Sequence, residues 1–279
     1  MMASGILRSL AALGLAALLG ACAHAPGAGP VPPTDPAQIG ELRPGLLRGY
    51  LDRSVLPDSL ALLPEPPASG SAAQAEDEAT YRATRPQLAG PRGALAKADA
   101  RLDFPTATGA FACAAHLDIT PQATPHLYTL MRRTLVDAGL STYRAKDHYK
   151  RTRPFAAHQD GSCTPEEEPK LAKDGSYPSG HAALGWAWAL VLSELMPDRT
   201  DALLQRGYAF GQSRVVCGVH WQSDVEAGRV VGAAAVARLH ADPVFEAQMR
   251  AAEGEIRAAR AAGRGTSADC AAEAAALKP

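Results

Sequence analysis

The stretch from His181 to Met196 constrains the fold more than any other segment, because it is apolar on nearly every side. Only Ser193 and Glu194 interrupt it, and Pro197 follows directly. The stretch is too short to cross a bilayer, which takes about 20 apolar residues in a helix. A helix that is apolar all round is buried by its neighbours. The sequence therefore predicts a central helix inside a bundle.

The rest of the chain also shows helical spacing of apolar residues and few strand signals. Thr124 and Pro125 form a helix-start pattern, and the apolar face that follows is expected to stop at Gly139. Further helices are expected to begin at three places: Thr200 or Asp201, near Ser223, and Pro243. Aromatic residues make up only 5% of the chain, which favours helices packed on helices over a β-sandwich. The predicted fold class is an all-α bundle.

The charges of the chain are balanced. Lys and Arg together number 28 and Asp and Glu 29, so the formal net charge is −1. Such a chain has no overall attraction for nucleic acid or for anionic membranes. Any anion that it binds must be held by cations gathered locally.

The first 22 residues have the pattern of an export signal. Arg8 precedes a short apolar run from Leu10 to Leu19, and small residues stand before Cys22. The segment 19–22 also resembles a lipobox, which would place a lipid anchor on Cys22; cleavage after it, near Ala23, is the alternative. Residues 23–45 are rich in Pro and Gly and are interpreted as a flexible linker. The expected location is the periplasm, with or without attachment to the outer membrane.

The remaining cysteines are even in number, which suggests up to two disulfides in an exported protein. The sequence does not rank the three ways of pairing Cys113, Cys163, Cys217 and Cys270. No pair has C-x-x-C spacing, so a structural zinc site is not expected.

Two clusters of residues are suited to anion binding. Residues 146–154 read KDHYKRTRP and gather Lys146 and Arg153 with two further cations, although such runs are usually solvated surface. Residues 175–181 read GSYPSGH and place Ser179, Gly180 and His181 at the start of the predicted central helix. The N–H groups and the positive dipole end of a helix start attract anions, but a simple capped turn explains the second cluster equally well.

A third cluster, SRVVCGVHWQSD, covers residues 213–224. Arg214 offers a planar fork of donors that fits phosphate oxygens. His220 and Asp224 are four residues apart, so one helical turn can bring the carboxylate to the imidazole. That pairing fixes the tautomer and leaves the other ring nitrogen free to attack. A structural His–Asp hydrogen bond is the alternative for this cluster alone.

Together the clusters supply three cations, a helix start, a proton donor and an oriented nucleophile, which phosphoryl transfer requires. The order K-x6-R-P, P-S-G-H, S-R-x5-H-x3-D resembles the type 2 phosphatidic-acid-phosphatase superfamily, which includes bacterial acid phosphatases, lipid phosphatases and vanadium haloperoxidases. A wider likeness to the class A bacterial non-specific acid phosphatases covers roughly residues 50–245. We therefore expect a catalytic domain over residues 46–245, of the all-α acid phosphatase/vanadium haloperoxidase type, and an Ala-rich helical extension over 246–279.

The resemblance implies a role for each matching position. His220 attacks phosphorus, Asp224 orients it, and His181 protonates the leaving alcohol. The phosphoryl oxygens are held by Lys146, Arg153, Ser179, Gly180 and Arg214. The implied reaction is hydrolysis of a broad range of small phosphate monoesters without a cofactor or metal, and the family allows transfer of the phosphoryl group to alcohols. Many relatives have Thr where this chain has Ala182, a difference that touches none of these roles.

Three other functions were weighed. A lipid phosphatase needs several membrane spans, which the sequence lacks. A vanadate-dependent haloperoxidase would use the same cradle with His220 as the vanadium ligand, and the class A likeness argues against it. A periplasmic oxyanion-binding protein would have no use for both His181 and an oriented His220. Packing roles are expected for His116, His126, His148, His158 and His240, and the sequence leaves a homo-oligomer open.

Overall fold

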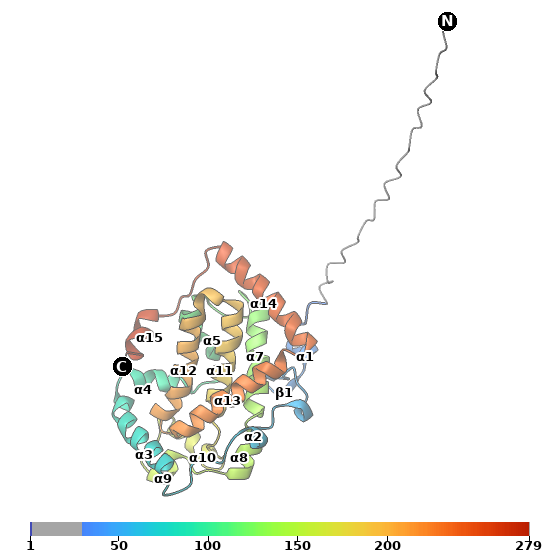
Figure 1. Ribbon diagram of the computed structural model, residues 1–279. Coiled ribbons are helices and arrows are strands. Elements are labelled where there is room, and N and C mark those ends of the chain that lie inside the picture. Colours follow the sequence, from blue (N-terminus) through green and yellow to red (C-terminus); the bar gives the residue numbers. More distant parts are fainter. Residues whose placement is uncertain (2–29, 279) are drawn as a thin grey trace.

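The computed structural model describes Met1 and residues 30–278, and it is built almost entirely of helices (Figure 1). Apart from Met1, the predicted signal sequence, with the cysteine predicted as a lipid anchor, lies outside these residues. The long helices are α3 (Ala72–Thr84), α4 (Pro91–Asp99), α7 (Pro125–Leu140), α11 (Gly180–Leu195), α12 (Thr200–Val216), α13 (Gln222–Leu239) and α14 (Pro243–Ala261). The prediction of an all-α bundle is confirmed.

Shorter elements connect these helices. They are α1 (Pro36–Ile39), β1 (Glu41–Arg43), β2 (Leu46–Leu47), α2 (Ser59–Leu62), α5 (Thr106–Gly109), α6 (Ala112–Ala115), α8 (Tyr143–Tyr149), α9 (Pro154–His158), α10 (Glu168–Leu171) and α15 (Cys270–Ala276). Four 3-10 turns lie at Arg53–Val55, Arg85–Ala89, Pro165–Glu167 and Pro197–Arg199. The two strands form one antiparallel hairpin. Among the described residues, no helix is long and apolar enough to cross a membrane.

Helix α11 lies at the centre of the bundle, as its apolar sequence predicts, with α7, α12 and α13 packed around it (Figure 1). Trp188 of α11 is fully buried, and its indole N–H donates to the Met131 carbonyl of α7 over 2.8 Å. The core is closed on one side by α14, whose Phe245 and Ile256 are buried. The domain boundary expected at residues 245 and 246 falls inside this helix.

Two expectations about helix ends and linkers differ from the structure. Helix α7 runs through Gly139 to Leu140, because a glycine within a helix lowers its stability without ending it. Residues 36–43, within the expected linker, form α1 and β1, and β2 follows directly after the linker. The chain after the hairpin is fixed to α7: the Asp137 carboxylate accepts from the backbone N–H groups of Tyr50 and Leu51 over 2.8 and 3.2 Å.

Both expected disulfides are present. Cys113 pairs with Cys270, and Cys163 pairs with Cys217. The first joins α6 to the C-terminal helix α15. The second joins the segment after α9 to the segment after α12, and that segment carries His220 toward α13.

Candidate active site

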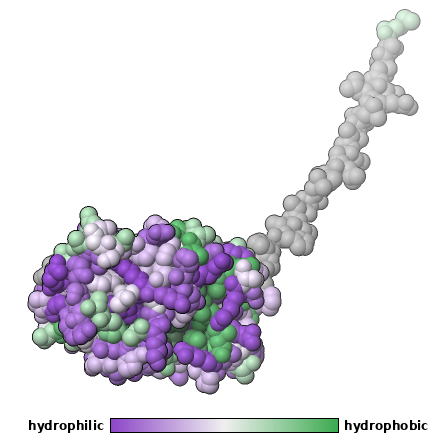
Figure 2. Space-filling view, turned by 90° about the horizontal axis from the view of Figure 1, so that it is seen from below, coloured by the Kyte–Doolittle hydropathy of each residue, from purple (hydrophilic) through white to green (hydrophobic). Residues whose placement is uncertain are grey.

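The three clusters meet where α11 begins, α12 ends and α13 begins. In Figure 1, α8, α9 and α10 lie together at the lower end of the bundle, and Figure 2 looks onto that end. Most of this face is hydrophilic, with a strip of apolar side chains. The proposed site residues lie beneath the surface: Lys146, Arg153 and His220 are each 3% exposed.

Close helix packing brings the second and third clusters together. Ser179 caps α11 by accepting from the Ala182 N–H over 3.3 Å, and its own N–H donates to the Asp224 carbonyl over 2.8 Å. Gly228 allows this approach, because a Cβ there would lie 2.5 Å from the Ser179 carbonyl oxygen. A larger residue at position 228 would separate the start of α11 from the start of α13.

His220 is oriented by Asp224 as the spacing predicts. Its Nδ1 lies 3.3 Å from Oδ2 of Asp224, and the same oxygen accepts from the Trp221 N–H over 2.9 Å. A carboxylate can only accept, so Nδ1 carries the hydrogen and Nε2 carries the lone pair. Burial, followed by the charges of Arg153 and Lys146, holds the pKa of His220 well below its usual value. The ring is therefore neutral, as a nucleophile must be.

Arg151 contacts Asp224, a pairing that the sequence did not predict. One of its terminal nitrogens donates to Oδ1 of Asp224 over 2.7 Å and to Ser223 over 2.8 Å. The other donates to Asp77 of α3 over 2.8 Å and to Gln74 over 2.6 Å. The carboxylate behind His220 is thus held from both sides.

Lys146 and Arg153 share their partners. Both donate to the Gly175 carbonyl, over 2.6 and 3.3 Å, and both lie near the Asp174 carboxylate, at 3.7 and 3.1 Å. Arg153 also points a terminal nitrogen at Nε2 of His220, 3.0 Å away. Burial, then the charge of Arg153, lowers the pKa of Lys146 to about 8.

Arg214 differs from the other cations because its donors are not all used. It is 1% exposed, and neither Nε nor Nη1 has a hydrogen-bond partner among the described residues. Its backbone carbonyl accepts from the N–H groups of Val219 and His220, which fixes it beside His220. Burial lowers the pKa of Arg214 to about 10. Buried donors without partners are costly, and an oxyanion would satisfy them.

His181 lies in the first turn of α11, with Nε2 3.0 Å from the Ala100 carbonyl. Because a carbonyl only accepts, Nε2 carries the hydrogen. Nδ1 makes no hydrogen bond within the described residues and is the nitrogen that can exchange a proton. Burial, followed by the charge of Arg214, lowers the pKa of His181 well below its usual value. A bound anion would act in the opposite direction.

The structure thus brings all eight predicted site residues to one place: Lys146, Arg153, Ser179, Gly180, His181, Arg214, His220 and Asp224. The other histidines have contacts of their own; His126, for example, bonds to Gln248, and His158 stacks on Tyr81. Within the described residues, no group of three or more His, Cys, Asp or Glu side chains is arranged to hold a metal.

Comparison with known proteins agrees with this geometry. Residues 123–245 match the model of the PAP2 superfamily. The chain is 47% identical to a non-specific acid phosphatase of Providencia stuartii, an alignment that covers 74% of this chain and 84% of the relative. It is 42% identical to an acid phosphatase of Zymomonas mobilis, over 73% and 77%, and 41% identical to a non-specific acid phosphatase of Salmonella typhimurium, over 70% and 78%. The chain therefore belongs to the class A non-specific acid phosphatases of the PAP2 superfamily.

Proposed function

We propose that this protein is an acid phosphatase that hydrolyses small phosphate monoesters through a phosphohistidine on His220. The observation that carries the proposal is the buried Arg214, whose two unpartnered nitrogens lie beside an oriented, neutral imidazole. Lys146 and Arg153 add positive charge to the same place. A phosphoryl group carries the charge and the oxygens that these donors require.

In the first step, Nε2 of His220 forms a bond to phosphorus as the bond to the leaving oxygen breaks. Asp224 accepts a hydrogen bond from Nδ1 and balances the positive charge that develops on the ring. The leaving alkoxide takes the proton from Nδ1 of His181. In the second step, Nδ1 of His181 takes a proton from water, the oxygen of that water attacks phosphorus, and the P–N bond breaks to release phosphate.

The cations act on the charge that spreads over the phosphoryl oxygens in the transition state. Nε and Nη1 of Arg214 have no competing acceptor in the part of the chain that the structure describes. Ser179 and Gly180 supply the positive end of the α11 dipole. Donors fixed in this way are each worth about 10²–10³ in rate.

The test is trapping of the phosphoenzyme in rapid-quench experiments with labelled p-nitrophenyl phosphate. His220→Asn should abolish both the acid-labile adduct and turnover. His181→Asn should slow the hydrolysis of alkyl phosphates about 10²–10⁴-fold. Hydrolysis of nitrophenyl phosphate, which has a good leaving group, should be slowed much less. His240→Asn serves as the control, because this histidine hydrogen-bonds to Glu194 and Glu246 on the surface. Normal labelling of His220→Asn would refute the proposal.

We also propose that the protein is exported to the periplasm. The two disulfides support this, since structural disulfides persist in oxidising compartments. Cell fractionation followed by mass spectrometry of the mature N-terminus would test it. Acylated Cys22 would identify a lipoprotein, a free N-terminus near Ala23 a soluble periplasmic protein, and uncleaved cytoplasmic protein would refute export.

A further inference from the structure

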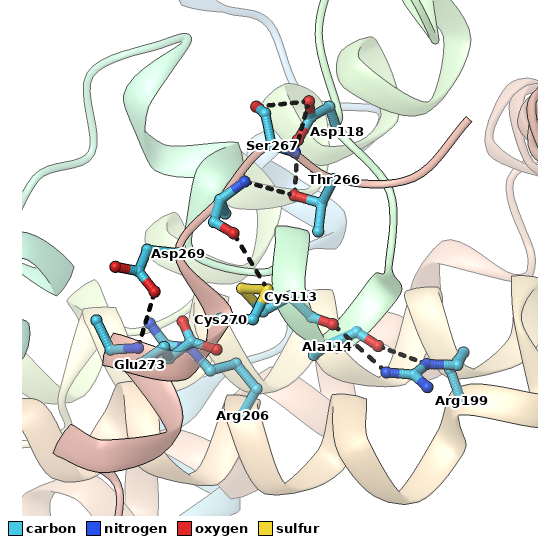
Figure 3. Close-up of a disulfide and its surroundings, with 12 residues drawn as sticks. Cys113, Ala114, Asp118, Arg199, Arg206, Thr266, Ser267, Asp269, Cys270 and Glu273 are labelled. Carbon is cyan, nitrogen blue, oxygen red and sulfur yellow. Dashed lines mark hydrogen bonds and ion pairs between the residues drawn. A yellow bond between two sulfur atoms is a disulfide. The ribbon is translucent and has the colours of Figure 1, made fainter. Parts of the chain in front are cut away.

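The C-terminal segment is attached to the body of the protein at several points (Figure 3). The disulfide joins Cys270 to Cys113 of α6. Just before it, the Asp118 carboxylate accepts from the hydroxyls of Thr266 and Ser267, over 2.7 and 2.8 Å. These bonds hold α15 against α4, far along the chain from any of the three motifs.

Helix α15 carries Glu273 to a buried arginine of α12. Nε of Arg206 donates to Glu273 over 3.1 Å, and its two terminal nitrogens donate to the two carboxylate oxygens of Asp99, at the end of α4. Arg206 and Asp99 are each 2% exposed. Burial alone would lower the pKa of Arg206, but the two carboxylates raise it above its usual value. The guanidinium is held between two anions.

Asp99 connects this group to two residues of the active site. Its Oδ2 accepts from the Ser213 hydroxyl over 2.6 Å, and Ser213 directly precedes Arg214. The next residue after Asp99 is Ala100, whose carbonyl accepts from Nε2 of His181. Asp99 therefore directly precedes Ala100, which contacts His181, and its carboxylate binds the side chain of Ser213, which directly precedes Arg214.

We propose that Asp99 is a positioning residue for the reaction, held in place by Arg206, which is in turn held by Glu273 of the disulfide-linked C-terminal segment. It fixes the Ala100 carbonyl against His181, and this keeps Nδ1 of that ring directed at the leaving group. The inference rests on the proposed role of His181 as the general acid. It assigns a catalytic contribution to residues 266–277, which lie outside the three motifs.

The chemistry makes the effect selective. A histidine that loses its Nε2 partner can rotate or change tautomer, and proton donation then suffers. Attack by His220 does not use this contact. A substitution that weakens the contact between Asp99 and Arg206 should therefore slow the hydrolysis of esters with poor leaving groups more than that of esters with good ones.

The test compares kcat for an alkyl phosphate and for p-nitrophenyl phosphate. Asp99→Asn keeps the shape but removes the charge held by Arg206. It should lower kcat for the alkyl ester about 10- to 100-fold and for the nitrophenyl ester only a few-fold, and move the alkaline limb of the pH profile. Glu273→Gln, which is only partly buried and should fold normally, should shift the ratio of the two rates in the same direction by about 2- to 10-fold.

Glu253→Gln is the matched control. It removes a carboxylate from α14 that pairs with Arg257 on the surface, so the ratio should stay unchanged. Equal slowing of both esters by Asp99→Asn and by Glu273→Gln, or no slowing by either, would overturn the inference. His181→Asn separates the two proposals: if it has no dependence on the leaving group, the proposed function fails; if it has one and the Asp99 and Glu273 variants have none, only the positioning role fails.

Discussion

Replacing Arg214 with methionine should make the protein more stable while it removes activity. Most substitutions of a buried residue are destabilising, so the expected gain is a stringent test of the site. Arg214 is 1% exposed, and Nε and Nη1 have no acceptor among the described residues. The folded protein therefore bears the cost of a desolvated cation, which an anionic ligand would offset.

The pKa of Arg214 gives the size of this cost. Burial lowers it from 12.5 to about 10, against an opposing effect of Glu167. Each pKa unit is worth about 1.4 kcal/mol, so charged Arg214 costs the folded state about 3 kcal/mol. The side chain is charged in the folded and unfolded states below pH 10, so the full cost is present at neutral pH and disappears only above the folded-state pKa. Allowing for imperfect packing of methionine, the free energy of unfolding should rise by about 1–3 kcal/mol.

Arg206 provides a matched control on the same helix. It is also almost fully buried, at 2% exposure, but Asp99 and Glu273 neutralise it. Arg206→Met would leave both carboxylates without their partner. Breaking a buried pair in this way costs about 3–5 kcal/mol. The two variants lose the same side chain, and we expect stability changes of opposite sign.

Urea unfolding of wild type and both variants, with and without inorganic phosphate, would measure these effects. Phosphate should stabilise wild type by mass action and stabilise Arg214→Met much less, because the variant lacks the donors of Arg214. Among these samples, wild type with phosphate and Arg214→Met without phosphate should have the most similar free energies of unfolding. A loss of stability in Arg214→Met similar to that in Arg206→Met would refute the argument that Arg214 is uncompensated.

Three further predictions follow from the same contacts. The pKa values of His220 and His181 both lie below the ordinary histidine value, so kcat/KM should peak on the acidic side of neutrality. The rate should rise as His220 loses its proton and fall as His181 loses its own. A maximum in alkaline solution would contradict this assignment. Arg151→Lys keeps the charge but not the double contact, so rapid-quench measurements should show phosphoenzyme forming about 10- to 100-fold more slowly, and an unchanged rate would exclude a positioning role. Gly232→Ala should lower the free energy of unfolding in urea by about 1–3 kcal/mol, because its Cβ would overlap the Ala183 carbonyl of α11. A Cβ at Gly139 would have no atom of the described residues within 4 Å, so Gly139→Ala should be neutral or stabilising. Equal effects of the two variants would show that the contact between α13 and α11 does not contribute to stability.

The helices could be predicted because their signals are local. The apolar run after Ser179 needs only its own sequence to indicate a buried helix, and α11 begins at Gly180 as that pattern implies. The N-terminal segment was harder to predict. The Pro and Gly content of residues 23–45 indicates a linker, but Arg132 of α7 donates to the Gly45 carbonyl from 87 residues away. Arg133 and Asp137 of the same helix bind the backbone of the residues that follow the linker. No local pattern contains that information.

The same distinction applies to the active site. His220 and Asp224 could be paired from their spacing, since a helical turn joins them. Arg151 could not be separated from the neighbouring cations, because all of them look alike in a basic run. Its partner Asp77 lies on α3, 74 residues earlier in the chain. Only the fold shows that Arg151 contacts a carboxylate, whereas Arg214 contacts none among the described residues.

Arg153 occupies the ring nitrogen of His220 that is proposed to attack phosphorus. Its Nη1 donates to Nε2 of His220, the atom proposed to attack phosphorus, and also to the Val219 carbonyl. A phosphoryl group must therefore take the place of the imidazole as a partner of Arg153 before Nε2 is free. The exchange is favourable, because the phosphoryl oxygens accept from Arg153 and also satisfy the two unpartnered nitrogens of Arg214. In the proposed mechanism, the reactivity of His220 is in this way coupled to the presence of the phosphoryl group.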